Sequence, residues 1–491
     1  MIKFTSKVFE NDYIPIIDAR QEGCVETSGV TLAEAEAIED LADVECLGIN
    51  SAKWAKIDRK GRRLKLGQYV GLVTVGPLSF EILPKVERYG GKSPGAGEAD
   101  LREMIALAGD FQYSSRSFDI QAGHDKKLLE YMAESFFKKL NAELNFGLRR
   151  SYQEHRDYLP SVRGRLDLVA LPLNYCRRPH ALPCVFEEFT EDTVLNRIMK
   201  QAVTILVRHA DFQGFNTKVV NLGLGLLDRM VHVGDSRYSY AEVSSVKPSR
   251  LESRYTDLVD FSKNIIRGNQ PFVRTSEPGK VRPGFTMVWD MSTVYEAAIA
   301  KKVEAYVENR YPGCSVVTQG RFDDSDARTR GHSGYNSYLA HEADGETGRF
   351  RLKPDIMIIG PDGAVLAVLD TKWKSYVPES NRKTKADGDY EEQNYKNVKK
   401  EDAYQMLAYA VSKRKDDKAD YPLVGLLYPS LQPASAEVLS FTNLDSPIHL
   451  AWVPVTESGL AGFNLDAILG RVLFTENKPD STGGGGFDKL T

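Results

Sequence analysis

Two aspartates and one lysine are spaced so that they could share the chemistry of one site. Asp355, Asp370 and Lys372 lie in two apolar, β-rich runs that flank Asp362-Gly363. Asp-Gly is a preferred two-residue hairpin turn, because glycine tolerates the positive φ that such a turn requires. With these two residues as the loop, Asp355 pairs with Asp370 across the strands. Lys372, two residues further along, points to the same face.

Facing carboxylates repel each other unless positive charge lies between them. A divalent cation is the simplest occupant, since Mg²⁺ prefers oxygen ligands and is commonly held by one or two carboxylates with water and substrate phosphate. Asp355 and Asp370 are therefore candidate ligands for Mg²⁺ or Mn²⁺, with Lys372 beside them for phosphodiester hydrolysis. A structural ion pair at the strand ends fits the same spacing, and both interpretations remain open.

The sequence around this hairpin resembles the PD-(D/E)xK nuclease signature, with Pro354-Asp355 followed by Asp370-Thr371-Lys372. Over about residues 65 to 430, the chain resembles the McrC family, the nuclease subunit of McrBC-type modification-dependent restriction systems. The other motifs that carry this resemblance are Tyr69-Val70-Gly71, Ile82-Leu83-Pro84-Lys85, Val162-Arg163-Gly164-Arg165-Leu166-Asp167, Glu188-Phe189-Thr190-Glu191-Asp192, Leu195-Asn196-Arg197, Trp289-Asp290-Met291, Val294-Tyr295-Glu296 and Asp402-Ala403-Tyr404-Gln405-Met406-Leu407-Ala408-Tyr409-Ala410.

The resemblance implies a DNA endonuclease in which Asp355 and Asp370 bind Mg²⁺ and Lys372 positions or activates the attacking water. It also implies that Glu296 points into the site from the first helix of the nuclease domain. Gln405, on a helix that lies against the hairpin, is implied to orient Lys372 or a water held by the metal.

The residue patterns alone offer structural roles for the two supporting residues. Thr293 and Glu296 have the spacing of a capping box at the start of a helix. Gln405 belongs to a polar stripe with Asp402 and Tyr409, which on a packed helix is often only a polar edge.

The resemblance implies a partner as well: a hexameric AAA+ NTPase of the McrB type, expected to use GTP, that recognises modified cytosine and translocates while this chain cuts double-stranded DNA. The sequence has no phosphate-binding loop of its own, because Gly91-Lys92-Ser93 lacks the glycine required five residues earlier, where Val86 stands. Two other functions remain open: a non-catalytic assembly or stimulatory factor with a degenerate nuclease fold, and a nuclease that needs no motor.

Composition bounds these functions. The 491 residues are 42% hydrophobic and 27% charged, as in globular proteins of several domains. The sequence shows no membrane-span or signal-peptide pattern and its five cysteines lack CxxC spacing, which together indicate a cytoplasmic protein without membrane contact. A net charge of −4 is not that of an autonomous DNA binder, so DNA contact is expected to rely on local basic patches or on the partner.

We expect a multidomain protein of α+β and α/β character. The expected parts are a β-rich domain at 1–95 that docks with the motor, a mainly helical domain at 99–275, a PD-(D/E)xK restriction-endonuclease-like α/β/α domain at 280–456 and a disordered tail at 475–491. The arginines between 149 and 165 are either a phosphate-binding patch or part of a solvated loop with internal ion pairs. Residues 320–350, with His332 and His341, are expected to form a surface loop.

Overall fold

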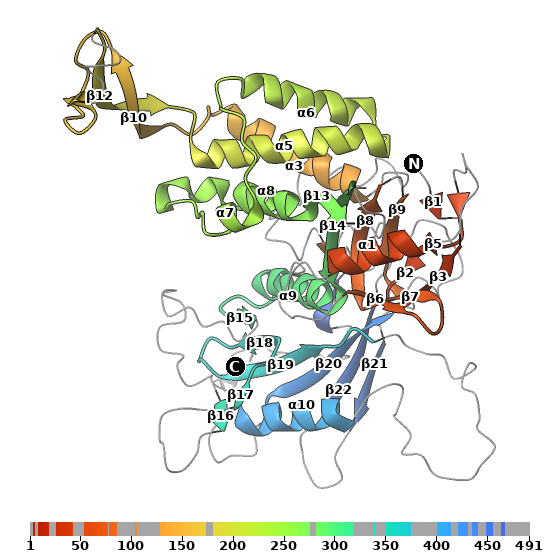
Figure 1. The fold of residues 1–491 in the computed structure, drawn as a ribbon. Coiled ribbons are helices and arrows are strands. Elements are labelled where there is room, and N and C mark those ends of the chain that lie inside the picture. Colours follow the sequence, from red (N-terminus) through yellow and green to blue (C-terminus); the bar gives the residue numbers. More distant parts are fainter. Residues whose placement is uncertain are drawn as a thin grey trace, which may run out of the picture. The chain divides into compact units, whose positions relative to one another are not determined.

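The computed structural model describes residues 3–4, 8–18, 26–42, 54–76, 78–85, 104–105, 128–172, 180–274, 281–318, 337–339, 350–374, 400–413, 421–430, 435–439, 448–454 and 463–466. Contacts divide the chain into two units, one of Met1–Pro84 with Asp110–Asp290 and one of Lys85–Gly109 with Met291–Thr491. The structure is mixed α and β with several sheets, as expected (Figure 1). Among the described residues no helix is long and apolar enough to cross a membrane.

The first unit begins with small sheets around helix α1 (Leu32–Ala42). A capping box begins this helix, because the Thr31 amide donates to Glu34 Oε2 at 2.9 Å and the Glu34 amide donates to Thr31 Oγ1 at 3.4 Å. One sheet has the strand order β5-β3-β7-β6 and another the order β13-β14-β8-β9-β2. The strands of the first 85 residues are β1 Lys3–Phe4, β2 Val8–Phe9, β3 Tyr13–Ile17, β4 Glu26–Thr27, β5 Val30–Thr31, β6 Ala55–Asp58, β7 Arg63–Leu66, β8 Tyr69–Val75 and β9 Leu78–Leu83.

The second half of this unit is built on helices, the longest being α3 (Leu128–Leu144) and α5 (Val194–Gln213). They pack with α6 (Thr217–Arg229) and α8 (Thr256–Gly268), and α7 (Tyr240–Ser244) lies against α8. The hairpin of β13 (Asn269–Arg274) and β14 (Val281–Asp290) follows, and β14 pairs with β8 of the N-terminal sheet. This pairing explains why contacts join the β-rich and helical regions and why the second unit starts at Met291 rather than near residue 280.

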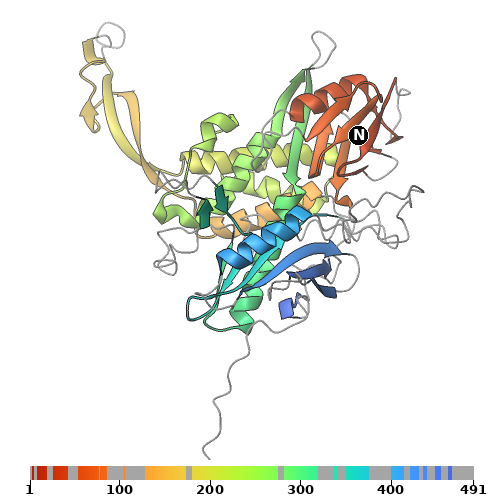
Figure 2. The same ribbon diagram turned by 90° about the horizontal axis from the view of Figure 1, so that it is seen from below.

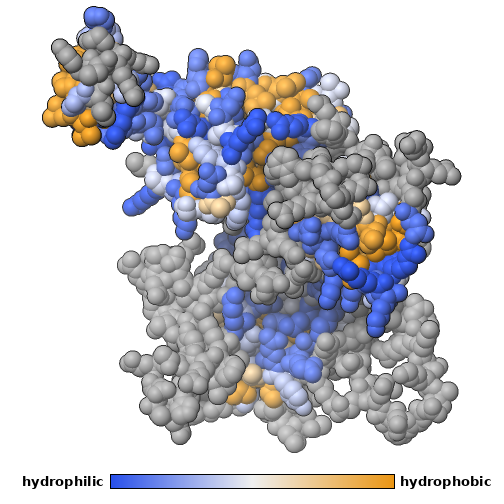
Figure 3. Space-filling model, in the orientation of Figure 1, coloured by the Kyte–Doolittle hydropathy of each residue, from blue (hydrophilic) through white to orange (hydrophobic). Residues whose placement is uncertain are grey.

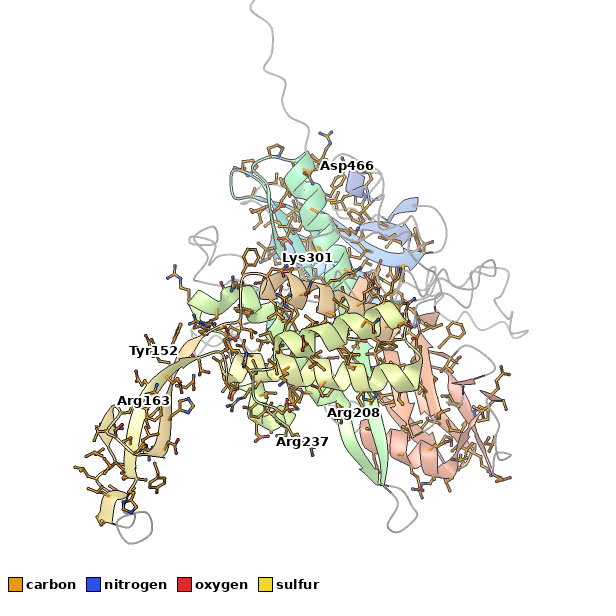
Figure 4. The ribbon with its side chains drawn as sticks, turned by 90° about the horizontal axis from the view of Figure 1, so that it is seen from above. Tyr152, Arg163, Arg208, Arg237, Lys301 and Asp466 are labelled. Carbon is orange, nitrogen blue, oxygen red and sulfur yellow. The ribbon has the colours of Figure 1, made fainter. Side chains whose placement is uncertain are left out.

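The arginine-rich segment between α3 and α5 is a sheet, not a loop. Strand β10 (Ser151–Leu159) pairs along its whole length with β12 (Leu182–Thr190), and the short β11 (Arg165–Leu166) pairs with the other edge of β12. Most side chains of β10 are exposed. Figures 1 and 4 show this sheet projecting from the helices, with Tyr152 and Arg163 along it. We call it the β-arm.

The second unit has one six-stranded mixed sheet in the order β15-β18-β19-β20-β22-β21. The central strands β19, β20 and β22 are parallel, and the other neighbours are antiparallel. The elements of this unit are α9 Met291–Arg310, β15 Ser315–Thr318, β16 Ser337–Leu339, β17 Phe350–Leu352, β18 Ile356–Ile359, β19 Val365–Thr371, α10 Lys400–Ser412, β20 Leu423–Ser430, β21 Ser435–Leu439 and β22 Ile448–Pro454.

Helix α10 covers one face of this sheet (Figure 2). Met406 and Ala410 share a hydrophobic cluster with Met357 and Val368, which alternate with residues of the opposite face as strand geometry requires. Helix α9 contacts β15 and β19, and the ring of Tyr295 meets that of Trp373 at 5.2 Å between centroids. The even-numbered residues of β19, including Asp370, therefore face α10. The odd-numbered residues face α9, as Trp373 does beyond the end of the strand.

Several expectations fall partly or wholly outside the described residues. The tail at 475–491 lies outside them, as do His332 and His341. Part of the segment expected to be a loop at 320–350 forms the short antiparallel pair β16–β17. The neighbouring strands β7 and β8 belong to different sheets, because β7 pairs with β3 and β6 whereas β8 pairs with β9 and β14.

Candidate active site

The hairpin of β18 and β19 brings Asp355 and Asp370 to opposed positions, although its turn differs from the sequence prediction. The Gly363 amide donates to the Gly360 carbonyl at 3.0 Å and the Gly360 amide donates to the Ala364 carbonyl at 2.8 Å, so the loop has three residues instead of two. Gly363 closes it with φ of +79°, a conformation that favours glycine.

The longer loop does not separate the two aspartates, because a β-bulge compensates for it. The extra loop residue moves the strand pairing by one position, and an irregularity between Ile358 and Ile359 moves it back. Ile356 pairs with Leu369, and the next opposed positions outward are Asp355 and Asp370. The predicted register is thus confirmed in the part of the hairpin that carries the charged residues.

Asp355 is held by Thr371, the residue that follows Asp370 on the opposite strand. The amide and the hydroxyl of Thr371 both donate to Asp355 Oδ2, at 2.7 and 2.9 Å. Within the described part of the chain, both hydrogen bonds of this carboxylate use Oδ2, which leaves Oδ1 for a further ligand. The sequence prediction gave Thr371 no role, since its contact with Asp355 exists only once the hairpin is paired.

Lys372 and Gln405 form a closed network with Asp370. The Lys372 ammonium is paired with Asp370 Oδ2 and donates to Gln405 Oε1 at 3.0 Å. Gln405 Nε2 donates to Asp370 Oδ1 at 3.3 Å and to Tyr409 Oη at 2.8 Å. The Tyr409 hydroxyl in turn donates to the Lys353 carbonyl at 2.9 Å. One glutamine therefore fixes both the acid and the lysine, and one tyrosine fixes the glutamine.

Helical spacing explains how α10 reaches this network while it packs on the sheet. Gln405 and Tyr409 are four residues apart and share one side of the helix. Met406 and Ala410, one position later in each case, are buried in the core. Gln405 and Tyr409 of the polar stripe thus face Asp370 and Lys372. The sequence prediction left the role of Tyr409 open, and the structure shows that it supports the site by fixing Gln405.

The site holds two carboxylates in conditions that disfavour their charge. Burial, and next the charge of Asp355, raise the pKa of Asp370 to about 7. Burial also raises the pKa of Asp355, against the hydrogen bonds from Thr371. For Lys372 burial acts to lower the pKa, but the surrounding carboxylates outweigh it and hold the pKa above the usual value.

Glu296 lies on the first turns of α9, and its charge reaches the network. It contributes to the raised pKa of Tyr409, after burial and the carboxylates of Asp370 and Asp355. The helix begins at Met291, so Thr293 lies in its first turn and not ahead of it as the capping box required. Sequence reasoning also missed an ion pair that links Lys374, three residues after β19, to Asp402 of α10.

A metal at this site would rely on Asp355 and Asp370. Among the described residues no group of three or more His, Cys, Asp and Glu side chains is arranged to hold a metal ion. Two opposed carboxylates are nevertheless sufficient protein ligands for Mg²⁺, which keeps several water ligands. Both are oxygen donors, and both have a pKa that a bound cation would lower.

Comparisons with known proteins agree with the sequence resemblance. The family model described as McrBC 5-methylcytosine restriction system component matches residues 64–429. A structure of a tetradecameric assembly of Thermococcus gammatolerans McrB AAA+ hexamers with bound McrC holds a chain of similar fold: the TM-score is 0.55 at 16% identity, over 94% of this chain and 97% of that one. A chain in the cryo-EM structure of the T. gammatolerans McrBC complex matches with a TM-score of 0.40 at 17% identity, over 62% of this chain and 86% of that one.

A comparison with curated proteins finds no match. The family match alone spans about three quarters of the chain, since it covers residues 64–429 of 491. The predicted family is confirmed, and the chain belongs to the McrBC family of 5-methylcytosine restriction system components.

Proposed function

We propose that this chain is the DNA endonuclease subunit of a McrBC-type complex and cuts DNA by Mg²⁺-dependent phosphodiester hydrolysis. The observation that carries the proposal is the network of Asp370, Lys372 and Gln405 opposite Asp355. The order of elements α9-β15-β18-β19-α10-β20, with a helix on each face of the sheet, supports a PD-(D/E)xK nuclease fold for the second unit.

Asp355, Asp370 and Lys372 are better suited to binding Mg²⁺ than to forming a structural ion pair without a metal. One lysine cannot neutralise two buried carboxylates. Burial raises the pKa of both acids, and the charge of Asp355 raises that of Asp370 further. When bound between Asp355 and Asp370, Mg²⁺ would supply positive charge to a scissile phosphate. We therefore assign the two aspartates as the metal ligands.

The remaining residues position groups for attack on that phosphate. Lys372 is held from two sides, by Asp370 and by Gln405, so its ammonium is fixed on the face that both aspartates share. There it would orient the attacking water and stabilise charge that develops on phosphorus. Gln405 and Tyr409 act through Lys372 and Asp370 and are positioning residues, and Glu296 is proposed as a further acid at the margin of the site.

The proposed partner is a hexameric McrB-type AAA+ NTPase, expected to use GTP, and residues 1–275 are proposed to dock with it. The structural relative described above contains McrC bound to McrB AAA+ hexamers, which supports a partner of this kind. The intact pairing of Asp355, Asp370, Lys372 and Gln405 disfavours the alternative of a non-catalytic assembly factor, because a site without activity gains nothing from buried opposed acids.

The test reconstitutes the full chain with a McrB-type motor and follows cleavage of methylated duplex DNA and phosphate release from the nucleotide. Asp370→Asn is expected to lower the cleavage rate about 10³-fold or more, as removal of a catalytic group does. Asp362→Asn, in the turn of the same hairpin, keeps an oxygen acceptor for the Ala364 amide and is expected to cut as the wild type does.

The Asp370→Asn protein should still stimulate nucleotide hydrolysis by the motor, because its substitution lies outside the docking region. Cleavage at the wild-type rate by Asp370→Asn would refute the assigned site. Loss of stimulation together with cleavage would show that the substitution disturbs more than the chemistry.

A further inference from the structure

The hairpin of β6 and β7 concentrates positive charge on the first unit. Six cationic residues and one acidic residue lie between Ala55 and Leu66, in a chain whose net charge is −4. The cationic residues are Lys56, Arg59, Lys60, Arg62, Arg63 and Lys65, and all six are exposed. We call this segment the basic hairpin. In Figure 3 the hydrophilic surface at the lower right of the N-terminal sheet corresponds to β6 and β7.

Strand alternation sends these charges to one face. Leu64 and Leu66 of β7 are buried in the core of the small domain, whereas Arg63 and Lys65 point outward. On β6 the outward residue Lys56 lies directly opposite Lys65. Like charges in directly opposed positions destabilise a sheet, so this face contains an electrostatic cost that an anionic ligand would relieve.

Internal ion pairs neutralise only part of this charge. Arg63 Nε donates to Asp58 Oδ2 at 2.9 Å, and Arg62 is paired with Asp18. No carboxylate of the described residues is paired with the four other cations, which are Lys56, Arg59, Lys60 and Lys65. These four remain available to a ligand.

The β-arm shows the opposite arrangement, although it also carries exposed arginines. Arg150 Nε donates to Glu191 at 2.9 Å, and Arg163 lies 3.7 Å from Glu188. Arg156 and Arg165 each approach Glu154 to 3.3 Å. A row of cations with neighbouring carboxylates gains little from phosphate, since each new contact must replace an existing ion pair.

An aromatic ring lies within the basic face. Tyr13 of β3 is opposite Lys65, is 46% exposed, and has the Arg63 guanidinium 4.0 Å above its ring centroid. Apart from this ring, the outward residues of β6 and β7 are charged. Lysine is depleted in the cores of protein–protein interfaces, whereas lysine and arginine supply most contacts to phosphate. The surface therefore matches a polyanion better than a protein partner.

We propose that the basic hairpin binds the phosphate backbone of double-stranded DNA without sequence preference. The inference deepens the proposed function, because it gives this chain its own contact with the DNA that it would cut. It does not require cleavage, and the two can fail separately.

The experiment measures the affinity of the full chain for a labelled DNA duplex without divalent metal, across a range of salt concentrations. The hairpin variant carries Lys56→Ser, Arg59→Ser, Lys60→Ser and Lys65→Ser. The control carries Arg156→Ser, Arg163→Ser and Arg165→Ser in the β-arm and Arg150→Ser directly before it. Each variant loses four positive charges, so the two have the same net charge, and thermal unfolding confirms that both are folded.

The hairpin variant is expected to lose affinity and to reduce the slope of log Kd against log salt by up to about 3 to 4 units, at about 0.9 per lost phosphate contact. The β-arm control should keep most of the slope. Equal losses of affinity in both variants would show that net charge alone matters and would overturn the inference. Failure of the wild-type chain to bind the duplex at low salt would overturn it as well.

A second readout separates DNA from an acidic protein partner. If the hairpin variant binds DNA as the wild type does but no longer stimulates the motor's nucleotide hydrolysis, the hairpin contacts protein and the inference is wrong. If the hairpin governs DNA affinity while the wild-type complex cuts no DNA, the proposed nuclease function fails and the inference stands.

Discussion

The candidate active site and the basic hairpin both gather charged residues on neighbouring strands, yet they differ in burial. At the candidate site the side chain of Asp370 is 2% exposed and that of Lys372 is 20% exposed. At the hairpin Lys56 and Lys65 project into solvent. In a poorly solvated site each charge depends on its neighbours, whereas exposed charges are screened by water and salt. The first cluster should therefore respond to substitution as a unit and the second one residue at a time.

The largest expected effect is the non-additive loss of cleavage at the candidate site. Asp370→Asn and Lys372→Ala should each reduce the cleavage rate of the reconstituted complex about 10³-fold or more, and the double variant should be little worse than either single variant. The reason is that each residue holds the other in place. Rates measured for all four proteins of this cycle decide the matter, and a double variant with the product of both losses would show that the residues act independently.

Smaller losses are expected one step away from the reacting atoms. Gln405→Ala should lower cleavage by about 10- to 100-fold, because Lys372 loses an acceptor and Asp370 loses a donor. Tyr409→Phe removes only the hydroxyl that fixes Gln405, so it should lower the cleavage rate less than Gln405→Ala does. Tyr404→Phe, on the exposed side of the same helix, is the matched control and should cut normally. An equal loss in Tyr404→Phe and Tyr409→Phe would place the effect in the helix and not in the network.

The sequence revealed the acids of this network and, through the family resemblance, Gln405, but not the roles of Thr371 and Tyr409. Two opposed aspartates could be inferred from apolar alternation and one turn signal, and they were placed correctly although the turn was not, because the bulge between Ile358 and Ile359 offsets the third loop residue. The contacts of Thr371 and Tyr409 depend on which helix packs on which face, and local periodicity contains no such information.

The β-arm and the basic hairpin show the same limit. Strand β10 has a mostly exposed sequence without apolar alternation, so it lacks the pattern that marks a half-buried strand. Two of the carboxylates that pair with arginines flanking this strand lie far along the chain: Glu188 of β12 pairs with Arg163, and Glu191, directly after β12, pairs with Arg150. Strand pairing therefore decides part of the neutralisation of the β-arm arginines, and the pairing that brings Lys56 opposite Lys65 is equally hidden in the sequence.

The stability of the metal-free protein should reveal the coupling of the buried acids through its pH dependence. The pKa of Asp370 in the folded protein, about 7, lies above that of aspartate in an unfolded chain. Between about pH 4 and 7 the folded state then binds more protons than the unfolded state, so stability falls as pH rises through this window. Asp370→Asn removes this titration, and in EDTA its stability should change less with pH.

At pH 8 the Asp370→Asn protein should exceed the wild type in free energy of unfolding by up to about 4 kcal/mol, a value that loss of the ion pair with Lys372 will reduce. Urea unfolding at several pH values measures both quantities, with Asp362→Asn as the control for loss of one exposed carboxylate. Added Mg²⁺ should narrow the difference, since it binds and stabilises only the protein that keeps both acids. Parallel pH profiles for the two variants would contradict the assignment of Asp370 as a buried, coupled acid.

The smallest expected effects belong to single substitutions in the basic hairpin. Lys56→Ser and Lys65→Ser should each reduce the slope of log Kd against log salt by about 1, and the double variant by about 2, because exposed cations contact separate phosphates. Additivity here, measured by the same cycle that tests Asp370 and Lys372, would confirm that burial and not composition decides how a charged cluster responds. A double variant no weaker than the single ones would show that the two lysines share one contact. In that case the mutual repulsion of Lys56 and Lys65, which either single substitution removes, would contribute to the free energy of DNA binding as much as the phosphate contact itself.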